Sequence, residues 1–76
     1  MVKVNGLDID IGSKLRVLIT RYIFVGEVVQ ITEYNEIILK DIKNTPITFK
    51  PKDTKFIQVL SEEEYEAIKE KYVKKS

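Results

Sequence analysis

The chain has 76 residues, of which 43% are apolar and 33% charged, and its 13 Lys and Arg against 12 Asp and Glu leave a formal net charge of +1. This length suits one small domain, the balanced charge excludes a disordered chain, and no apolar run approaches the about 20 residues of a membrane span. There is no Cys and no His, which excludes disulfides, thiolate metal sites and the commonest nucleophile–base pairs. Composition therefore favours a non-catalytic binding or scaffolding module without a cofactor.

The first 12 residues are expected to form a hairpin. Apolar and polar residues alternate over residues 2–4 and again over residues 7–11. Between these two arms lies Asn5-Gly6, the dipeptide that favours a tight turn with positive φ at both positions. Gly12-Ser13 is expected to end the second arm.

Residues 13–60 are expected to form a five-stranded barrel. Segments rich in β-branched residues alternate with turn signals, and the expected strands are residues 14–19, 22–31, 36–42, 47–49 and 55–60. Gly26 lies in the middle of the second strand, where an interior glycine usually marks a sharp bend or a close backbone approach. Five short strands with such a bend indicate a small, strongly bent sheet that closes as an SH3-like or OB-like barrel.

Several of these strands are apolar on both faces. In the second strand, for example, Phe24 and Val28 alternate with Val25 and Val29. One face can fill the barrel, and the other must be covered by the hairpin, by the C-terminal segment or by another subunit. A chain this small without a disulfide or a metal often gains stability by oligomerising, so we expect a homo-oligomer.

Residues 61–76 are expected to form an α-helix. Ser61 and Glu64 have the spacing of a capping box, and Leu60 and Tyr65 occupy the positions of a hydrophobic staple. Glutamates at the start and lysines at the end of the segment suit the helix dipole. The apolar side chains of one stripe of this helix are Tyr65, Ile68, Tyr72 and Val73.

Residues 24–39 resemble the first motif of the Sm-like (Lsm) family. That motif runs through an apolar pair, Gly, further apolar positions, an acidic turn with an aromatic residue or His, Asn, and an apolar triplet. Here Phe24-Val25-Gly26 begins the pattern and Ile37-Ile38-Leu39 ends it, without a gap in the spacing. The resemblance covers residues 14–60 and implies an Sm-like barrel in which Gly26 is the bend of the second strand.

The resemblance also implies a binding site for single-stranded RNA on a ring of subunits. In the family the aromatic residue of the turn stacks on a base, and Tyr34 takes that position. The family's base-reading Asn is replaced by Glu36, with Asn35 one place early, and an ionised carboxylate only accepts hydrogen bonds. The Arg-Gly of the second motif is replaced by Lys50-Pro51, which keeps the charge without the planar guanidinium.

Nucleic-acid binding is therefore expected at two segments. The candidate residues are Tyr34, Asn35, Glu36, Lys50, Lys52 and Lys55. Alternatively, the aromatic ring packs over the barrel rim and the lysines deter strand pairing at a solvated edge. The alternative function is a protein–protein scaffold that has kept the barrel and lost its nucleotide pocket, and Glu36 and Pro51 favour it.

Two further expectations concern metal and location. The glutamates of residues 62–66 have a spacing that serves helix capping, and Asp8 and Asp10 suit the wet side of the hairpin, so no metal site is predicted. The first residues lack the pattern of a signal peptide, so we expect a cytoplasmic location and no membrane partner.

Overall fold

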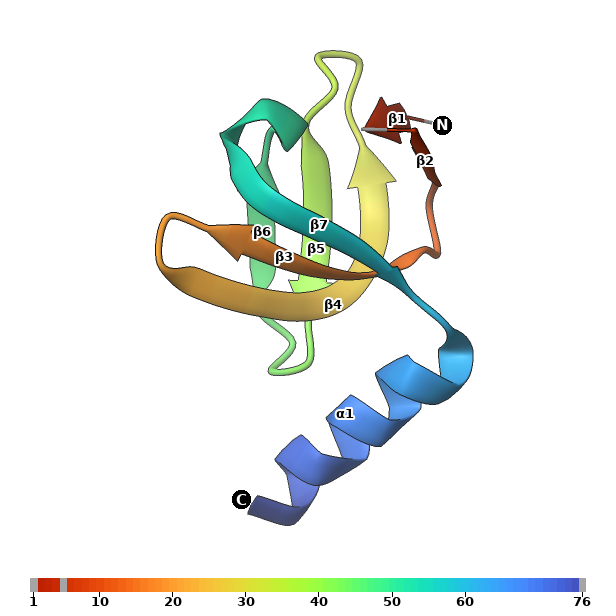
Figure 1. Cartoon of the computed structure of the whole chain (residues 1–76), viewed down its shortest axis with the longest axis vertical. Coiled ribbons are helices and arrows are strands. Elements are labelled where there is room, and N and C mark those ends of the chain that lie inside the picture. Colours follow the sequence, from red (N-terminus) through yellow and green to blue (C-terminus); the bar gives the residue numbers. More distant parts are fainter. Residues whose placement is uncertain (1, 5, 76) are drawn as a thin grey trace.

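The computed structural model describes residues 2–4 and 6–75, and the side chains of residue 3 and residues 6–72. A short hairpin precedes a five-stranded sheet, and an α-helix follows the sheet (Figure 1). The elements are β1 (Val2–Val4), β2 (Leu7–Ile9), β3 (Lys14–Ile19), β4 (Tyr22–Ile31), β5 (Ile37–Asp41), β6 (Pro46–Phe49), the 3₁₀ turn η1 (Pro51–Asp53), β7 (Thr54–Leu60) and α1 (Glu62–Lys75).

The large sheet is antiparallel throughout, with the strand order β6-β5-β4-β3-β7. The last strand pairs with the first strand of the sheet, so η1 carries the chain from the edge at β6 to the opposite edge at β7. Within the described residues, β6 and β7 are not paired with each other, and the sheet is open. The predicted small, mostly β domain with five strands and a C-terminal helix is thus confirmed.

Gly26 lies where β4 passes from one half of the sheet to the other. It pairs with Leu15 of β3 on one side and with Asp41 of β5 on the other. A Cβ atom at this position would overlap the Lys40 carbonyl oxygen and lie 2.7 Å from the Asp41 Cα. The close backbone approach predicted for Gly26 is therefore confirmed, and Figure 1 shows the strong curvature of β4.

The core fills the concave side of this bent sheet. Its fully buried side chains come from β2, β3, β4 and β5, and they are Ile9, Leu15, Val17, Val28, Ile37 and Leu39. Phe49 of β6 completes the cluster. Because Ile9 belongs to β2, the N-terminal hairpin contributes directly to the core of the sheet.

The expected hairpin forms, but its second arm is shorter than predicted. β2 ends at Ile9, and Ile11, expected on this arm, lies in a turn with its side chain exposed. The reason is local hydrogen bonding, since the Asp10 N–H donates to Ser13 Oγ at 3.0 Å and the Ser13 N–H donates to the Asp10 carbonyl at 3.0 Å. Gly6 has a φ of 84°, as the predicted turn requires, while Asn5 lies outside the described residues.

The helix begins with the predicted capping box. The Ser61 N–H donates to Glu64 Oε1 at 3.0 Å, and the Glu64 N–H donates to Ser61 Oγ at 3.1 Å. The backbone bond from Ser61, and then the side-chain bond, hold the pKa of Glu64 below its ordinary value of 4.5. Leu60 and Tyr65 are both buried, as the hydrophobic staple requires, while the Val73 side chain at the end of the predicted stripe lies outside those described.

Lys14 joins the first turn of α1 to the sheet. On the helix side, its Nζ lies 5.6 Å from the centre of the Tyr65 ring and 3.3 Å from a Glu62 oxygen. On the sheet side, it lies 3.8 Å from a Glu27 oxygen and donates to the Gly12 carbonyl at 3.0 Å. Burial, with the nearby Glu27 carboxylate as the next cause, raises the pKa of the Tyr65 hydroxyl. The start of α1 therefore packs on its own sheet, at the end of the molecule opposite the N-terminal hairpin (Figure 1).

Candidate nucleic-acid interface

Thr32 organises the turn between β4 and β5. Its N–H donates to the Glu36 carbonyl at 2.9 Å, and its carbonyl accepts from the Asn35 N–H at 3.1 Å. Its Oγ1 accepts from the N–H groups of Glu36 at 3.1 Å and Tyr34 at 3.3 Å. Asn35 has a φ of 62°, a conformation that Asn tolerates better than most residues. The backbone of this predicted turn is therefore held in one conformation.

Tyr34 stands out from this turn with 72% of its surface exposed. This exposure argues against the alternative in which the ring packs over the rim of the sheet. An exposed aromatic ring on a hydrogen-bonded turn is a suitable stacking surface for a nucleobase.

Glu36 closes the turn and is half-buried. Its backbone makes both hydrogen bonds with Thr32, whereas its carboxylate forms no hydrogen bond or ion pair with any described residue.

The segment after β6 lies beside the Tyr34 turn. Ile37 pairs with Phe49, so the next residue, Lys50, follows β6 at the strand end where Glu36 enters β5. Pro51 opens η1, as suits the first position of a helical turn. Lys50 and Lys52 are exposed, so this end of the sheet combines an aromatic ring with mobile positive charges.

Lys55 lies apart from this group. It is an exposed residue of β7, next to Thr54, which pairs with Ile19 at the end of β3. The structure thus brings Tyr34, Asn35, Glu36 and Lys50 to one end of the sheet, and η1 leads from there through Lys52 to Lys55.

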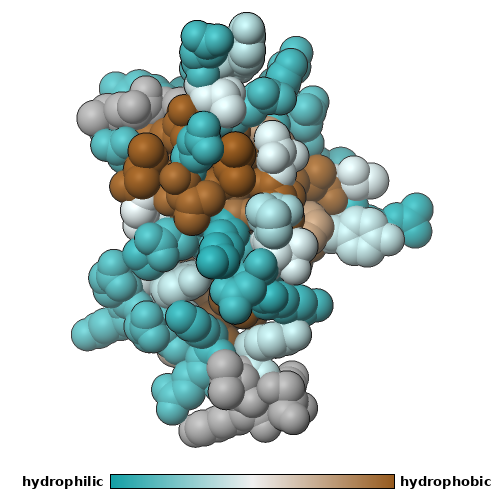
Figure 2. Space-filling model, turned by 180° about the vertical axis from the view of Figure 1, so that it is seen from behind, coloured by the Kyte–Doolittle hydropathy of each residue, from teal (hydrophilic) through white to brown (hydrophobic). Residues whose placement is uncertain are grey.

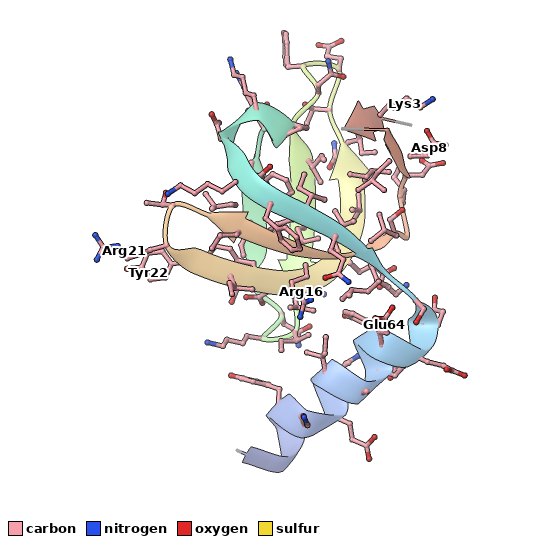
Figure 3. The ribbon with its side chains drawn as sticks, viewed as in Figure 1. Lys3, Asp8, Arg16, Arg21, Tyr22 and Glu64 are labelled. Carbon is pink, nitrogen blue, oxygen red and sulfur yellow. The ribbon has the colours of Figure 1, made fainter. Side chains whose placement is uncertain are left out.

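Exposed residues also surround the connection between β3 and β4. Thr20 and Arg21 form the two-residue turn between β3 and β4, with a φ of 57° at Thr20. Tyr22 and Ile23 follow with 63% and 65% of their surfaces exposed. Figure 3 shows Arg21 and Tyr22 at the outer end of this hairpin, pointing away from the sheet. Neither Gly nor Asn marks this turn, so the sequence did not distinguish it as a projecting tip.

Apolar side chains also gather on the face of the molecule shown in Figure 2. We define the outer apolar patch as Ile11, Val29 and Ile38, because Ile38 pairs with Gln30, the residue that follows Val29 in β4. Ile11 and Val29 are exposed and Ile38 is half-buried. The Gly12 N–H donates to the Val28 carbonyl at 2.8 Å, which places the turn that carries Ile11 beside β4.

A small hollow between α1 and the sheet has a volume of about 170 Å³. Its lining residues are Glu27, Lys40, Asp41, Ile42, Asn44, Tyr65 and Lys69. Acidic and basic groups are mixed in this lining, so it does not select an anion or a cation.

The described part of the chain contains neither a metal-binding cluster nor a helix that could span a membrane. Within residues 2–4 and 6–75, no cluster of three or more His, Cys, Asp or Glu is arranged to hold a metal ion. Within the same ranges, the helix is too short and too polar to cross a membrane.

Compared with known proteins, the chain shows no significant match to a family model, a curated protein or a solved structure.

Proposed function

We propose that the protein is a non-catalytic module that binds single-stranded RNA, built on an Sm-like barrel and assembled as a homo-oligomeric ring. The observation that carries this proposal is the exposed Tyr34 on a turn fixed by Thr32, beside Lys50. Stacking of a base on such a ring contributes about 1–3 kcal/mol, and neighbouring lysines neutralise phosphates.

The strand order supports the barrel. The last strand, β7, pairs with β3, and β4 bends at Gly26 so that one strand serves both halves of the sheet. Strong bending of a central strand at a glycine is typical of small β-barrels.

The open edge of β7 supports the ring. Val59 faces the core side of the sheet, because it pairs with the fully buried Leu15 and shares a strand face with Ile57, which packs on the core. Even so, 39% of Val59 is exposed. A strand β6 from a second copy, paired with β7, would cover this side chain and satisfy the unpaired backbone. Such an interface uses different surfaces of each copy, and it forms a ring when the rotation closes.

A ring would also reconcile RNA binding with a net charge of only +1 per chain. Each subunit presents a small group of exposed lysines, Lys50 and Lys52, beside one aromatic ring. Repetition around a ring raises the effective concentration of these groups along one strand, so that weak contacts add to a stable complex.

Fluorescence anisotropy with a uridine-rich or adenine-rich oligoribonucleotide at two salt concentrations tests this function. Tyr34→Ala should weaken binding by about 1–3 kcal/mol per stacked base and leave the salt dependence nearly unchanged. Lys50→Ala should instead reduce the salt dependence and weaken all sequences alike. Tyr34→Phe keeps the ring and is the matched control. If the wild type does not bind at low salt, the proposal is wrong.

The outer apolar patch favours a second candidate function, a protein–protein scaffold. An exposed cluster such as Ile11, Val29 and Ile38 is typical of a surface that another protein covers. Glu36→Asn separates the two candidates, because it removes a negative charge and restores a group that both donates and accepts hydrogen bonds. Tighter RNA binding by this variant supports the RNA function. If neither the wild type nor this variant binds RNA, the scaffold is favoured.

A further inference from the structure

The tip between β3 and β4 has the features of a second stacking site. Tyr22 is largely exposed, and its ring centre lies 6.5 Å from that of Phe24 at an interplanar angle of 39°. The two rings are therefore neighbours on one face of β4. Arg21 lies next to it at the end of the hairpin, where both side chains point away from the sheet (Figure 3).

An irregularity in β7 brings a further cation to this tip. Ile19 pairs with Thr54 and Leu18 pairs with Phe56, so Lys55 is the extra residue between the two pairs. Ile23 and Phe56 are also exposed, but both pair with Leu18, so they lie on the opposite face of the sheet from Tyr22, the partner of Ile19. We define the tip site as Arg21, Tyr22 and Lys55.

The charge of the tip site suits an anionic partner. Among the described residues, neither Arg21 nor Lys55 has a carboxylate within ion-pair distance. The neighbouring η1 adds Lys52 and Asp53, which leaves three positive side chains against one carboxylate. A surface that combines unpaired cations with an exposed aromatic ring matches the phosphates and bases of a single strand.

The segment of residues 50–55 connects the tip site to the Tyr34 turn. It begins after Phe49, the partner of Ile37, and reaches Thr54, the partner of Ile19. The segment therefore leads from the strand end beside the Tyr34 turn to the strand end beside the tip, and its six residues span at most about 20 Å. We propose that a bound RNA strand continues from Tyr34 along this segment and stacks a second base on Tyr22, with a phosphate on Arg21. This inference rests on the proposed RNA-binding function.

Oligonucleotide length tests the inference, because only a longer strand reaches both tyrosines. Affinities for uridine-rich strands of about 4 and about 16 nucleotides are measured by anisotropy. Tyr22→Ala should weaken binding of the long strand at least about fivefold and leave the short strand unchanged. Arg21→Gln should lower the salt slope for the long strand by about 0.7. Both side chains are exposed, so these variants should keep the thermal stability of the wild type, and Tyr22→Phe is the matched control.

The outcomes separate this inference from the proposed function. If Tyr34→Ala weakens both strands while Tyr22→Ala and Arg21→Gln weaken neither, the RNA function stands and the tip site is wrong. If the wild type binds neither strand, both proposals are wrong. If the tip variants bind RNA normally but lose binding to vesicles that contain anionic lipid, the tip is a membrane contact and the inference is overturned.

Discussion

The tyrosines show how burial separates structural residues from candidate binding residues. Tyr65 is buried beside Lys14 and fastens α1 to the sheet. Tyr72, on the same helix, is 37% exposed, and its ring centre lies 5.6 Å from Lys43 Nζ. Tyr34 and Tyr22 are more exposed, at two tight connections. The same residue type therefore occurs in different environments in this chain, which the sequence alone does not distinguish.

Gly26 is the single residue on which the bend of β4 depends most directly. In Gly26→Ala, the new methyl group would overlap the Lys40 carbonyl oxygen, a backbone atom that cannot turn aside. We expect a loss of about 1–3 kcal/mol or more in the free energy of unfolding, measured by urea denaturation. Val29→Ala, at an exposed position of the same strand, is the control and should have a much smaller effect. Equal stability of Gly26→Ala and wild type would contradict the close approach.

The capping box determines where the helix starts. Ser61→Ala removes the hydroxyl that accepts from the Glu64 N–H, so we expect a loss of about 1 kcal/mol and a lower melting temperature. Ser61→Asp retains an acceptor at this position and should preserve most of the stability. An unchanged melting temperature in Ser61→Ala would show that the first turn of α1 does not contribute to stability.

The same element predicts a dependence on pH. Because the folded pKa of Glu64 is lowered from 4.5, the ionised carboxylate stabilises the fold above the unfolded value. That stabilisation is lost as the pH falls through the lowered folded pKa. The melting temperature of the wild type should therefore fall more between pH 7 and pH 3 than that of Glu64→Gln. Parallel curves for the two proteins would contradict the assignment of this hydrogen bond.

At the scale of the whole molecule, the five-stranded sheet has two unpaired edges within the described residues, β6 and β7. If these edges pair between copies, light scattering after gel filtration should give a multiple of 8.9 kDa. Val59→Lys places a charge in the predicted interface and should shift the protein toward the monomer. Ile11→Lys is the matched control, because it adds the same charge to the outer apolar patch. A monomeric wild type at micromolar concentration would exclude the ring, and dissociation by Ile11→Lys instead would place the interface at that patch.

Local signals in the sequence determined most of the secondary structure. β-Branched segments separated by turn residues predicted β3 to β7 to within a residue or two at each end, and Ser61 with Glu64 located the start of α1. Gly26 indicated the bend. These predictions succeeded because capping, turn formation and strand alternation depend on interactions between residues close in the chain.

The tertiary structure alone decided which of these residues share a surface. Strand pairing placed Lys50 beside the Tyr34 turn and carried Lys55 to the tip with Arg21. It also left Ile11 exposed, although its alternation with Asp10 had suggested a strand. The physical reason is that exposure and neighbourhood depend on contacts between strands far apart in sequence, and on local hydrogen bonds that compete with pairing, neither of which hydrophobic periodicity records.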